Sequence, residues 1–443
     1  MNPRRTRAIR PTGQQGFTLI ELLVALAVTV IVVLGILLLF DFNNKLTRVQ
    51  TNVADMQQSE RIAQYDMVRM ARMAGRGGLP VSALVVNQSA ALPLGSGISV
   101  LNNAPANTHL VAADTSSPKV LLGTDVLTLR GAFSTPIYEA AFANPSTFTL
   151  TGPGTPTPAT ATGGTVAICD QSPSGAAQDL TGLTALIDLA AGGKIRKEAL
   201  ILVSPTADTI YSIVALDPSI STKTAATCPG NAGVTIAFIS DPADPMVAKY
   251  RALYPAPVGN LNDSLKNVAF VGLLEEYRYY VREDHAIAGT DTSDLTPVLS
   301  RARFYPGTDL VYADEASNLK QDIADGIVDL QIAFGIDANS DGQLTTDPPA
   351  DPATDEWLGN AAADTAITGG LKAIRISTLA RTNRRDHDYV APVLASLEDH
   401  TYSTTDINDP VNGYDAVNFK GSMARLYRRR VLQTVVNLRN LTQ

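Results

Sequence analysis

The stretch Gly16-Phe17-Thr18-Leu19-Ile20-Glu21 runs without a break into the apolar segment LLVALAVTVIVVLGILLLF, which ends at Phe40. As a helix, residues 17–40 would extend about 36 Å at ~1.5 Å per residue, enough to cross a hydrocarbon core of about 30 Å. The preceding residues include Arg4, Arg5, Arg7 and Arg10 and no acidic residue. The positive-inside tendency therefore predicts a cytoplasmic amino terminus and an exported remainder.

A single carboxylate, that of Glu21, lies inside this apolar segment. A charged side chain in a membrane helix costs free energy, about 2–3 kcal/mol at the helix centre and less toward the interface, so Glu21 needs a compensating partner. If the chain were cut after Gly16, the new α-amino group of Phe17 would be a cation able to pair with Glu21 of an adjoining subunit. The spacing therefore predicts a role for Glu21 in assembly.

Gly16, Phe17 and Glu21 resemble the type IV prepilin signature residue by residue. The resemblance implies that a prepilin peptidase cuts between Gly16 and Phe17 and that the new Phe17 terminus is N-methylated. An ordinary single-pass anchor and a secretory signal peptide are the alternatives, and Ala25-Leu26-Ala27 would serve as the cleavage site of the latter. Neither alternative explains Glu21.

Length and charge restrict how many globular units the exported portion can form and what it can bind. Behind the leader (residues 1–16) and the apolar helix, the 443-residue chain keeps enough sequence for one large or two modest globular units. The net charge of −8 becomes more negative by four when the leader arginines are removed, which disfavours a broad nucleic-acid footprint. Cys169 and Cys228 both lie in the exported portion, where we expect them to form a disulfide; two buried thiols are the alternative.

Beyond the membrane segment, apolar residues recur at alternating three- and four-residue steps. They are Leu46, Val49, Val53, Met56, Ala63, Met67, Met70 and Ala74, and Glu60 is the one polar interruption. The pattern predicts an amphipathic helix over residues 41–77 that continues the first one and ends at Gly75, Gly77, Gly78 and Pro80. We favour packing of this stripe against a sheet over a promiscuous methionine-rich binding face.

From residue 78 on, the composition predicts a β-rich head that extends to residue 443, with one or two sub-domains. The expected strands are 120–122, 126–129, 199–203, 209–214, 234–239 and 268–281, with 371–379 and 428–440 near the end. Residues 275–280 (EEYRYY) and 301–305 (RARFY) predict a hairpin, 323–334 a turn feeding a strand, and 149–164 an exposed loop. The fold class is α+β, a long helix on a large antiparallel sheet.

Both ends of the chain resemble the PilW-type minor pilins of type IV pili and, more distantly, the J-type pseudopilin of type II secretion. The similar segments are GFTLIELLVALAV and MVRMARMAGRGG at the front, with EYRYY, IADGIVDLQIAFGID, LKAIRISTLARTNR and RRRVLQTVVNLRN at the back. Residues 81–260 show no such likeness. The resemblance implies a pilin-like fold and a low-abundance subunit that primes pilus assembly near the tip.

The same resemblance implies where the protein acts and what it contacts. The location is the inner membrane and then the pilus. The implied partners are prepilin peptidase, other minor pilins, the major pilin and a tip adhesin. A type II secretion pseudopilin and an adhesive or DNA-contacting pilin are the alternatives.

A possible calcium loop follows the strand that ends near residue 336. Asp337, Asn339 and Asp341 offer oxygens at alternate positions, Gly342 permits a sharp turn and Gln343 offers its carbonyl. The twelfth position holds Pro348 instead of a bidentate glutamate, which argues against an EF-hand. A remaining ligand would come from Asp347, Asp351, Asp355 or Glu356, and the alternative is an Asx-turn without metal. No cofactor is required otherwise.

No arrangement typical of an enzyme is present. The histidines His109, His285, His387 and His400 lack metal-ligand spacing, and neither a nucleophile elbow nor a phosphate loop occurs. Two basic clusters remain, Arg381, Arg384 and Arg385, and Arg425, Arg428, Arg429 and Arg430. We expect them to contact acidic partner subunits rather than DNA, because no base-stacking aromatics are obviously interleaved with them.

Overall fold

The computed structural model describes residues 17–76, 97–112, 114–140, 165–192, 198–203, 211–238, 270–285, 295–306, 320–337, 341–344, 356–359, 370–406, 409–413 and 424–438. The chain divides into two compact units, Met1–Ala54 and Asp55–Gln443, which are described in turn. The expected loop at 149–164, and Gly77, Gly78 and Pro80, lie outside the described residues.

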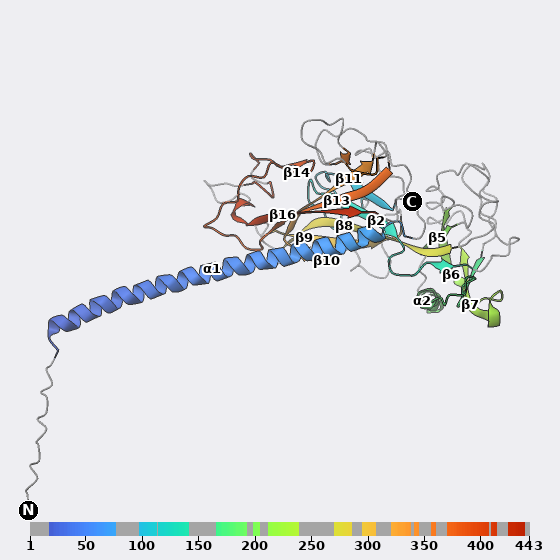
Figure 1. Cartoon of the computed structure of the whole chain (residues 1–443), viewed down its shortest axis with the longest axis horizontal. Helices are drawn as coiled ribbons and strands as arrows, with labels where there is room; N and C mark the ends of the chain where they lie inside the picture. The colour runs from blue at the N-terminus through green and yellow to red at the C-terminus, as the bar shows by residue number, and fades with distance from the viewer. Residues whose placement is uncertain are drawn as a thin grey trace, which may run out of the picture. The chain divides into compact units, whose positions relative to one another are not determined.

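The first unit contains the beginning of a long helix, α1 (Leu19–Met73), drawn in blue in Figure 1. Within the described residues, α1 is the one helix long and apolar enough to cross a membrane. Its apolar window has a mean hydropathy of 3.3, and none of it is buried by the rest of the chain. The membrane-spanning segment expected at residues 17–40 therefore coincides with this helix.

In the second unit, the last part of α1 packs on the β-rich head. Met56, Ala63, Met67 and Met70 are buried, so the methionines belong to the core as expected. The predicted stripe was too long toward the membrane, because the side chain of Leu46 is 44% exposed. The helix also ends earlier than expected, at Met73.

The end of α1 is fixed by the residues that follow it. Gly75 takes a φ of +76°, which suits glycine, and its N–H donates to the Arg130 carbonyl at 2.8 Å. The chain therefore leaves the helix against the first long strand of the head.

Within the described residues, ten strands form the larger sheet. They are β1 (Ile98–Leu101), β2 (Val126–Gly131), β3 (Tyr138–Glu139), β4 (Thr165–Cys169), β5 (Ala199–Val203), β6 (Tyr211–Thr224), β7 (Ala232–Phe238), β8 (Phe270–His285), β9 (Leu295–Phe304) and β10 (Gln321–Asp325). The main order is β1-β2-β8-β5-β6-β7-β4, and β8 also pairs with β3 and with β9, which continues to β10. Of the strands expected from the sequence, 120–122 is absent, because Val120 forms only an isolated bridge to Arg282.

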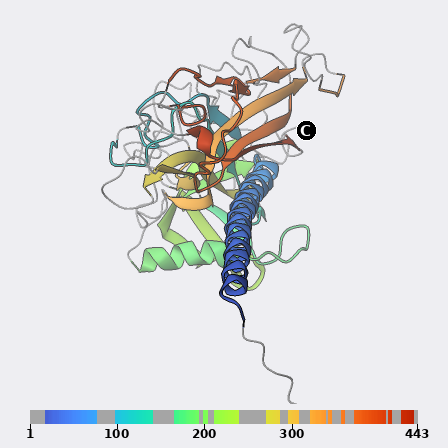
Figure 2. The ribbon, with the colours of Figure 1, turned by 90° about the vertical axis from the view of Figure 1, so that its left-hand side faces the viewer.

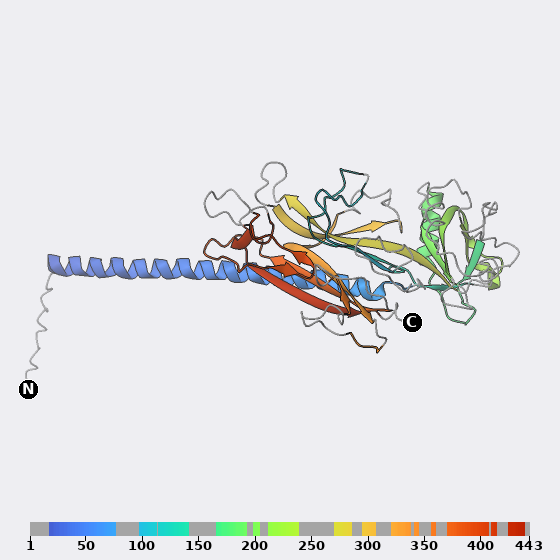
Figure 3. The ribbon, with the colours of Figure 1, turned by 90° about the horizontal axis from the view of Figure 1, so that it is seen from above.

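The longest strand, β8, joins two parts of the head. Its first residues pair with β5, and its later residues pair with β2 and β9. The expected hairpin is confirmed, with Tyr277 opposite Arg303 and Tyr279 opposite Arg301. Figure 3 shows β8 and β9 in yellow, in a layer separate from the orange and red strands of the second sheet.

A short helix, α2 (Thr181–Ala191), covers one end of the larger sheet. Leu183 and Leu186 of α2 pack in one apolar cluster with Leu200, Val234 and Ile236 of the sheet. Figure 2 shows α2 in green, away from the orange and red strands. The sequence interpretation had not included this helix.

The second sheet has four strands in the order β12-β11-β13-β16, all antiparallel. Its strands are β11 (Ile327–Asp337), β12 (Trp357–Leu358), β13 (Gly370–Arg381) and β16 (Arg429–Asn437). Gly326, at a φ of +77°, makes the expected turn before β11, and the expected C-terminal strand is β16. A small hairpin, β14 (Ser396–Leu397) and β15 (His400–Thr401), and two 3-10 turns, η2 (Pro229–Asn231) and η5 (Ala424–Leu426), complete the described elements.

Cys169 and Cys228 are joined in a disulfide, as expected. The bond connects the end of β4 to the segment just before η2, and both sulfur-bearing residues are buried with Ala225. It closes a chain segment with a sequence separation of 59 residues. In the chain-entropy model, restricting a segment of this length destabilises the unfolded chain.

Replacing both cysteines with serine should therefore lower the free energy of unfolding by about 3–4 kcal/mol. Urea unfolding of the detergent-solubilised protein, followed by far-UV circular dichroism, would measure the change. Reductant should shift the wild-type midpoint toward that of the double variant and leave the double variant unchanged. Equal midpoints for the two proteins under oxidising conditions would contradict a stabilising role for the disulfide.

Candidate functional site

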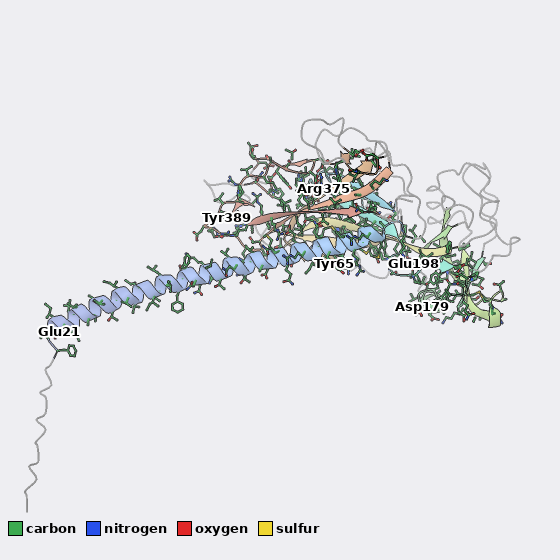
Figure 4. All side chains as sticks on the ribbon, viewed as in Figure 1. Glu21, Tyr65, Asp179, Glu198, Arg375 and Tyr389 are labelled. Atoms are coloured by element: carbon green, nitrogen blue, oxygen red, sulfur yellow. A yellow bond between two sulfur atoms is a disulfide. The ribbon has the colours of Figure 1, made fainter. Side chains whose placement is uncertain are left out.

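The residues of the prepilin signature lie at the start of α1, although Gly16 is outside the described residues. Phe17 is 88% exposed. The Thr18 main-chain N–H and its hydroxyl both donate to Glu21 Oε2 at 2.9 Å, and the Glu21 N–H donates to Thr18 Oγ1 at 3.3 Å. This reciprocal arrangement is a capping box, which satisfies otherwise unpaired N–H groups of the first turn. Figure 4 labels Glu21 at this end of α1.

The capping box uses only part of the Glu21 carboxylate. Within the described part of the chain, Glu21 Oε1 accepts no hydrogen bond. One oxygen therefore stabilises the helix start, and the other is available to a second partner. The sequence signal Thr-x-x-Glu was present and had not been interpreted as a cap.

The segment behind Glu21 presents apolar surface on all sides. Every Leu, Ile, Val and Phe from Leu19 to Phe40 is exposed in the isolated chain. Such a surface requires lipid or other apolar helices around it. The first unit therefore needs an apolar environment along its whole length.

The other end of α1 is attached to the second sheet through a buried amide. Gln64 Nε2 donates to Thr378 Oγ1 at 3.0 Å and lies 3.3 Å from the carbonyl oxygens of Ile376 and Leu432. These acceptors belong to β13 and β16, at neighbouring positions of the sheet. One side chain of the helix thus contacts both strands.

A carboxylate two residues further on attaches α1 to the larger sheet. The Tyr279 hydroxyl of β8 donates to Asp66 Oδ2 at 2.6 Å, and Arg301 Nη1 of β9 lies 3.2 Å from the same oxygen. Burial, and then the negative charge of Asp66, raise the pKa of Tyr279 well above its usual range, so its proton stays in place to donate. Gln64 and Asp66, within one turn of α1, together connect the helix to both sheets.

Glu60 is the polar residue that interrupts the apolar stripe, and it is fully buried. Arg430 Nε of β16 lies 3.3 Å from Glu60 Oε2, but neither carboxylate oxygen accepts a hydrogen bond from the described part of the chain. Burial raises the pKa of Glu60 to about 7, although the positive charge of Arg430 opposes that shift. Glu60 is therefore a buried acid that changes charge near neutral pH.

The two basic clusters have partners inside the head. The guanidinium of Arg381 lies 4.1 Å from the centre of the Tyr427 ring, and that of Arg428 pairs with Asp386 at 2.9 Å. Arg429 Nη1 donates to the Val411 carbonyl at 2.6 Å. Much of this charge is therefore used within the chain. The expected contact of these arginines with other subunits stays a prediction.

A further polar cluster connects three parts of the head and had not been found from the sequence. Asp329 of β11 accepts hydrogen bonds from the Tyr402 hydroxyl at 2.5 Å, from His400 Nδ1 at 2.7 Å and from Gln331 Nε2 at 2.9 Å. Burial opposes protonation of His400, but the hydrogen bond to Asp329 and its charge raise the pKa of the imidazole. Gln331 also donates to the Gly123 carbonyl at 2.8 Å, next to β2. Only the folded chain brings these residues together.

The predicted calcium loop is partly described. Asp337, Asp341 and Gln343 are within the described residues, and Asn339 is outside them. Asp337 Oδ2 accepts from the Gly342 N–H at 3.0 Å, and Asp341 Oδ1 accepts from the Gln343 N–H at 2.7 Å. Over the described residues, no three His, Cys, Asp or Glu side chains converge on a metal position.

Family models of known proteins match segments near both ends of the chain. The family model described as Type IV Pilus-assembly protein W matches residues 278–440, from within β8 to just beyond β16, and the Prokaryotic N-terminal methylation motif matches residues 11–37. No curated protein matches the chain. Among solved structures, the Type IV-like pilin TTHA1219 from Thermus thermophilus is 10% identical over 60% of this chain and 100% of that chain, with a TM-score of 0.19.

The apolar helix, the methylation motif at its start and the β-rich head define a type IV pilin-like protein, anchored in the inner membrane and then assembled into the pilus. The match to the PilW model over residues 278–440, together with the methylation motif at the other end of the chain, supports a type IV minor pilin of the PilW family. The family implies contact with other pilins and processing of the motif by prepilin peptidase. Pilins are structural subunits, generally without enzymatic activity.

The buried position of Glu60 predicts a pH-dependent stability. Because its folded pKa is raised from 4.5 to about 7, the folded state holds a proton that the unfolded chain releases between these values. The contribution of the protonated Glu60 carboxyl to the free energy of unfolding is complete below about pH 4.5 and is lost as the pH rises through about 7.

Glu60→Gln should remove this dependence and raise the free energy of unfolding at pH 8 by up to about 3 kcal/mol. Urea midpoints measured from pH 4.5 to 8 would test it, with Asp55→Asn, at an exposed position of the same helix, as the control. A Glu60→Gln protein that loses stability with pH as the wild type does would contradict the assignment.

Proposed function

We propose that this protein primes assembly of a type IV pilus and stays at or near the tip of the filament. The observation that carries the proposal is that one chain combines an apolar helix that needs neighbours with a large β-rich head. The helix supplies what every filament subunit needs. The head, residues 55–443, is a large mass to fit between stacked subunits, and the filament end is where no further subunit packs beyond it.

The contacts that Gln64 and Asp66 make with the strands of the head also support this proposal. They hold the last part of α1 on both sheets in one orientation, so the head presents a defined surface to a neighbouring subunit. A priming subunit has to present such a fixed surface to the subunits that follow. The partners would be other minor pilins, the major pilin and a tip adhesin, with DNA not among them.

Glu21 would act in assembly by pairing with an amino group. Cleavage between Gly16 and Phe17 creates a cation at the start of the helix, and Glu21 Oε1 is free of its own capping box. The cation is the N-methylated amino terminus of an adjoining subunit. Bringing the two charges together within an apolar environment removes the cost of leaving each one alone.

Removal of the gene should abolish or strongly reduce surface pili, and expression in trans should restore them. A tag on the head should then appear at one end of sheared filaments in immunoelectron microscopy, because a priming subunit is the first to leave the membrane. Normal pili with lost attachment or DNA uptake would instead indicate a binding pilin. Normal pili with lost protein export would indicate a type II secretion pseudopilin.

Two substitutions of Glu21 separate charge pairing from helix capping. Glu21→Gln keeps an acceptor for the Thr18 N–H but removes the charge, whereas Glu21→Ala removes both. Both variants should still be cut and N-methylated at Phe17, as shown by the amino-terminal mass. Incorporation into sheared pili should fall several-fold in both if pairing matters. Normal incorporation of Glu21→Gln with loss only in Glu21→Ala would leave capping as the role of this residue.

A further inference from the structure

Three buried oxygen atoms on one face of α1 have no hydrogen-bond donor among the described residues. They are both carboxylate oxygens of Glu60, which is fully buried, and Oε1 of Gln64, which is 5% exposed. The Gln64 amide is oriented by its nitrogen, because Nε2 donates to Thr378 Oγ1 and faces main-chain carbonyls of β13 and β16. Acceptors cannot satisfy one another, so this face of the helix lacks a donor.

Glu60 and Gln64 are neighbours on that buried face. They are four residues apart in α1, a spacing that puts Cβ atoms about 5–6 Å from each other in a helix. Helical side chains lean toward the N-terminal end, so the Gln64 side chain extends over the turn that carries Glu60. A proton on the Glu60 carboxyl would therefore supply the missing donor, with Gln64 Oε1 as its acceptor.

Two arginines act on the Glu60 carboxylate within the described part of the chain. Arg430 Nε of β16 lies 3.3 Å from Glu60 Oε2 without making a hydrogen bond, and the Arg430 side chain is 37% exposed. Arg61 of α1 is the other, whereas β13 places the uncharged Thr378 and Ala380 beside these residues. Water screens an exposed guanidinium, so Arg430 offsets only part of the cost of an ionised, buried Glu60.

We propose that Glu60 changes its partner with its protonation state, donating to Gln64 Oε1 when protonated and pairing with Arg430 when ionised. The protonated form joins Glu60 to the amide that already contacts β13 and β16, and it satisfies Gln64 Oε1. The ionised form draws the guanidinium away from water and leaves Gln64 Oε1 without a donor. The contact between α1 and the C-terminal strand is therefore tightest when Glu60 carries its proton.

Such an exchange would make one of the two attachments of the helix sensitive to pH near neutrality. Burial raises the pKa of Glu60 to about 7, and the charges of Arg430 and Arg61 oppose that shift. The attachment of Asp66 to the larger sheet keeps its donor in this range, because the pKa of Tyr279 is raised well above its usual value. Above neutral pH, the second sheet would therefore loosen on α1 while the larger sheet stays attached. This inference does not depend on the proposed role in priming.

Infrared difference spectroscopy tests the protonation directly in the full-length, detergent-solubilised protein. A protonated carboxyl group has a C=O stretching band that is separate from the bands of carboxylates. The wild-type protein should lose one such band as the pH is raised from about 6 to about 8. Glu60→Gln should lack this band at every pH, which assigns it to Glu60.

Two substitutions should shift the midpoint of this band in opposite directions. Gln64→Met removes the acceptor that favours the protonated form, so the midpoint should fall by about 0.5–1 pH unit. Arg430→Met removes a cation that favours the ionised form, so the midpoint should rise by a similar amount. Arg69→Met, at an exposed position of the same helix, should leave the midpoint unchanged. Because Arg430 is partly exposed, its variant should fold and tests the proposal even if Gln64→Met does not fold.

Hydrogen exchange of the strands gives the structural result of the exchange of partners. After correction for the intrinsic pH dependence of amide exchange, residues 429–437 of β16 should exchange several-fold faster at pH 8 than at pH 6 in the wild-type protein. In Glu60→Gln the corrected rates should be equal at both pH values. Residues 295–304 of β9, which contact α1 through Arg301 and Asp66, serve as the internal control and should not change.

Absence of a Glu60-dependent carboxyl band at pH 6 would overturn the proposal, since Glu60 would then be ionised in the folded protein. A midpoint that Arg430→Met lowers or leaves unchanged would overturn the pairing with Arg430, and one that a folded Gln64→Met raises or leaves unchanged would overturn the pairing with Gln64. Equal corrected exchange of β16 at both pH values in the wild-type protein would overturn the loosening. None of these results bears on surface piliation, which tests the role in priming separately.

Discussion

The position of the end of α1 on the head depends on two polar side chains within one turn of the helix, the buried Gln64 and the partly buried Asp66. Met56, Ala63, Met67 and Met70 supply apolar area, but an apolar stripe permits a helix to slide or rotate with little change in free energy. Hydrogen bonds are directional, and a buried donor or acceptor that loses its partner is penalised. Gln64 on β13 and β16, and Asp66 on β8 and β9, therefore select one register of the helix on both sheets.

The two sheets are also connected away from the helix, again by buried polar groups. Asp125, just before β2, accepts the main-chain N–H of Asn103 at 2.8 Å and that of Ile332 in β11 at 2.7 Å. Burial raises the pKa of Asp125 well above its usual range, and these two hydrogen bonds oppose that shift. Asp329 and Gln331 add a second connection through His400 and Gly123. The head thus combines two apolar sheets with a few directional contacts that fix how they meet.

Local periodicity explains which elements could be predicted from the sequence. The three- and four-residue steps of residues 49–74 predicted the amphipathic end of α1. Alternating or continuous apolar runs predicted β5, β8, β11, β13 and β16, and the aromatic and arginine residues of EYRYY and RARFY predicted the β8–β9 hairpin. The prepilin signature was found because its chemistry lies within six adjacent residues. In each case the signal is contained in a short window.

The features that the sequence did not predict either join residues that are far apart along the chain or have only weak local signals. Glu60 was recognised as an interruption, but its partner Arg430 lies 370 residues further on, and no local pattern connects them. The cluster of Asp329, His400 and Tyr402 could not be predicted for the same reason, since an isolated histidine has no characteristic spacing to its partners. The basic clusters were interpreted as surfaces for partners because their aromatic and acidic neighbours, such as Tyr427 and Asp386, are brought to them by folding. The short helix α2 has Leu180 at its N-cap, and the side chain that accepts from its first N–H, Asp179, lies one residue earlier, which weakened the usual signal of a helix start.

In the proposed function, Glu21 would matter because α1 moves from the membrane into the filament. The side chains of Leu19–Phe40 are exposed in the isolated chain, and in the proposed assembly step they would exchange lipid for neighbouring helices. Lipid tails are as apolar as leucine, so this exchange supplies little hydrophobic free energy in either direction. The free-energy difference between membrane and filament then depends on groups that lipid solvates poorly. Glu21 is the ionisable residue within residues 19–40. A charge that is unfavourable in lipid and paired in the filament would favour the filament, which is why one carboxylate can matter among so many apolar residues.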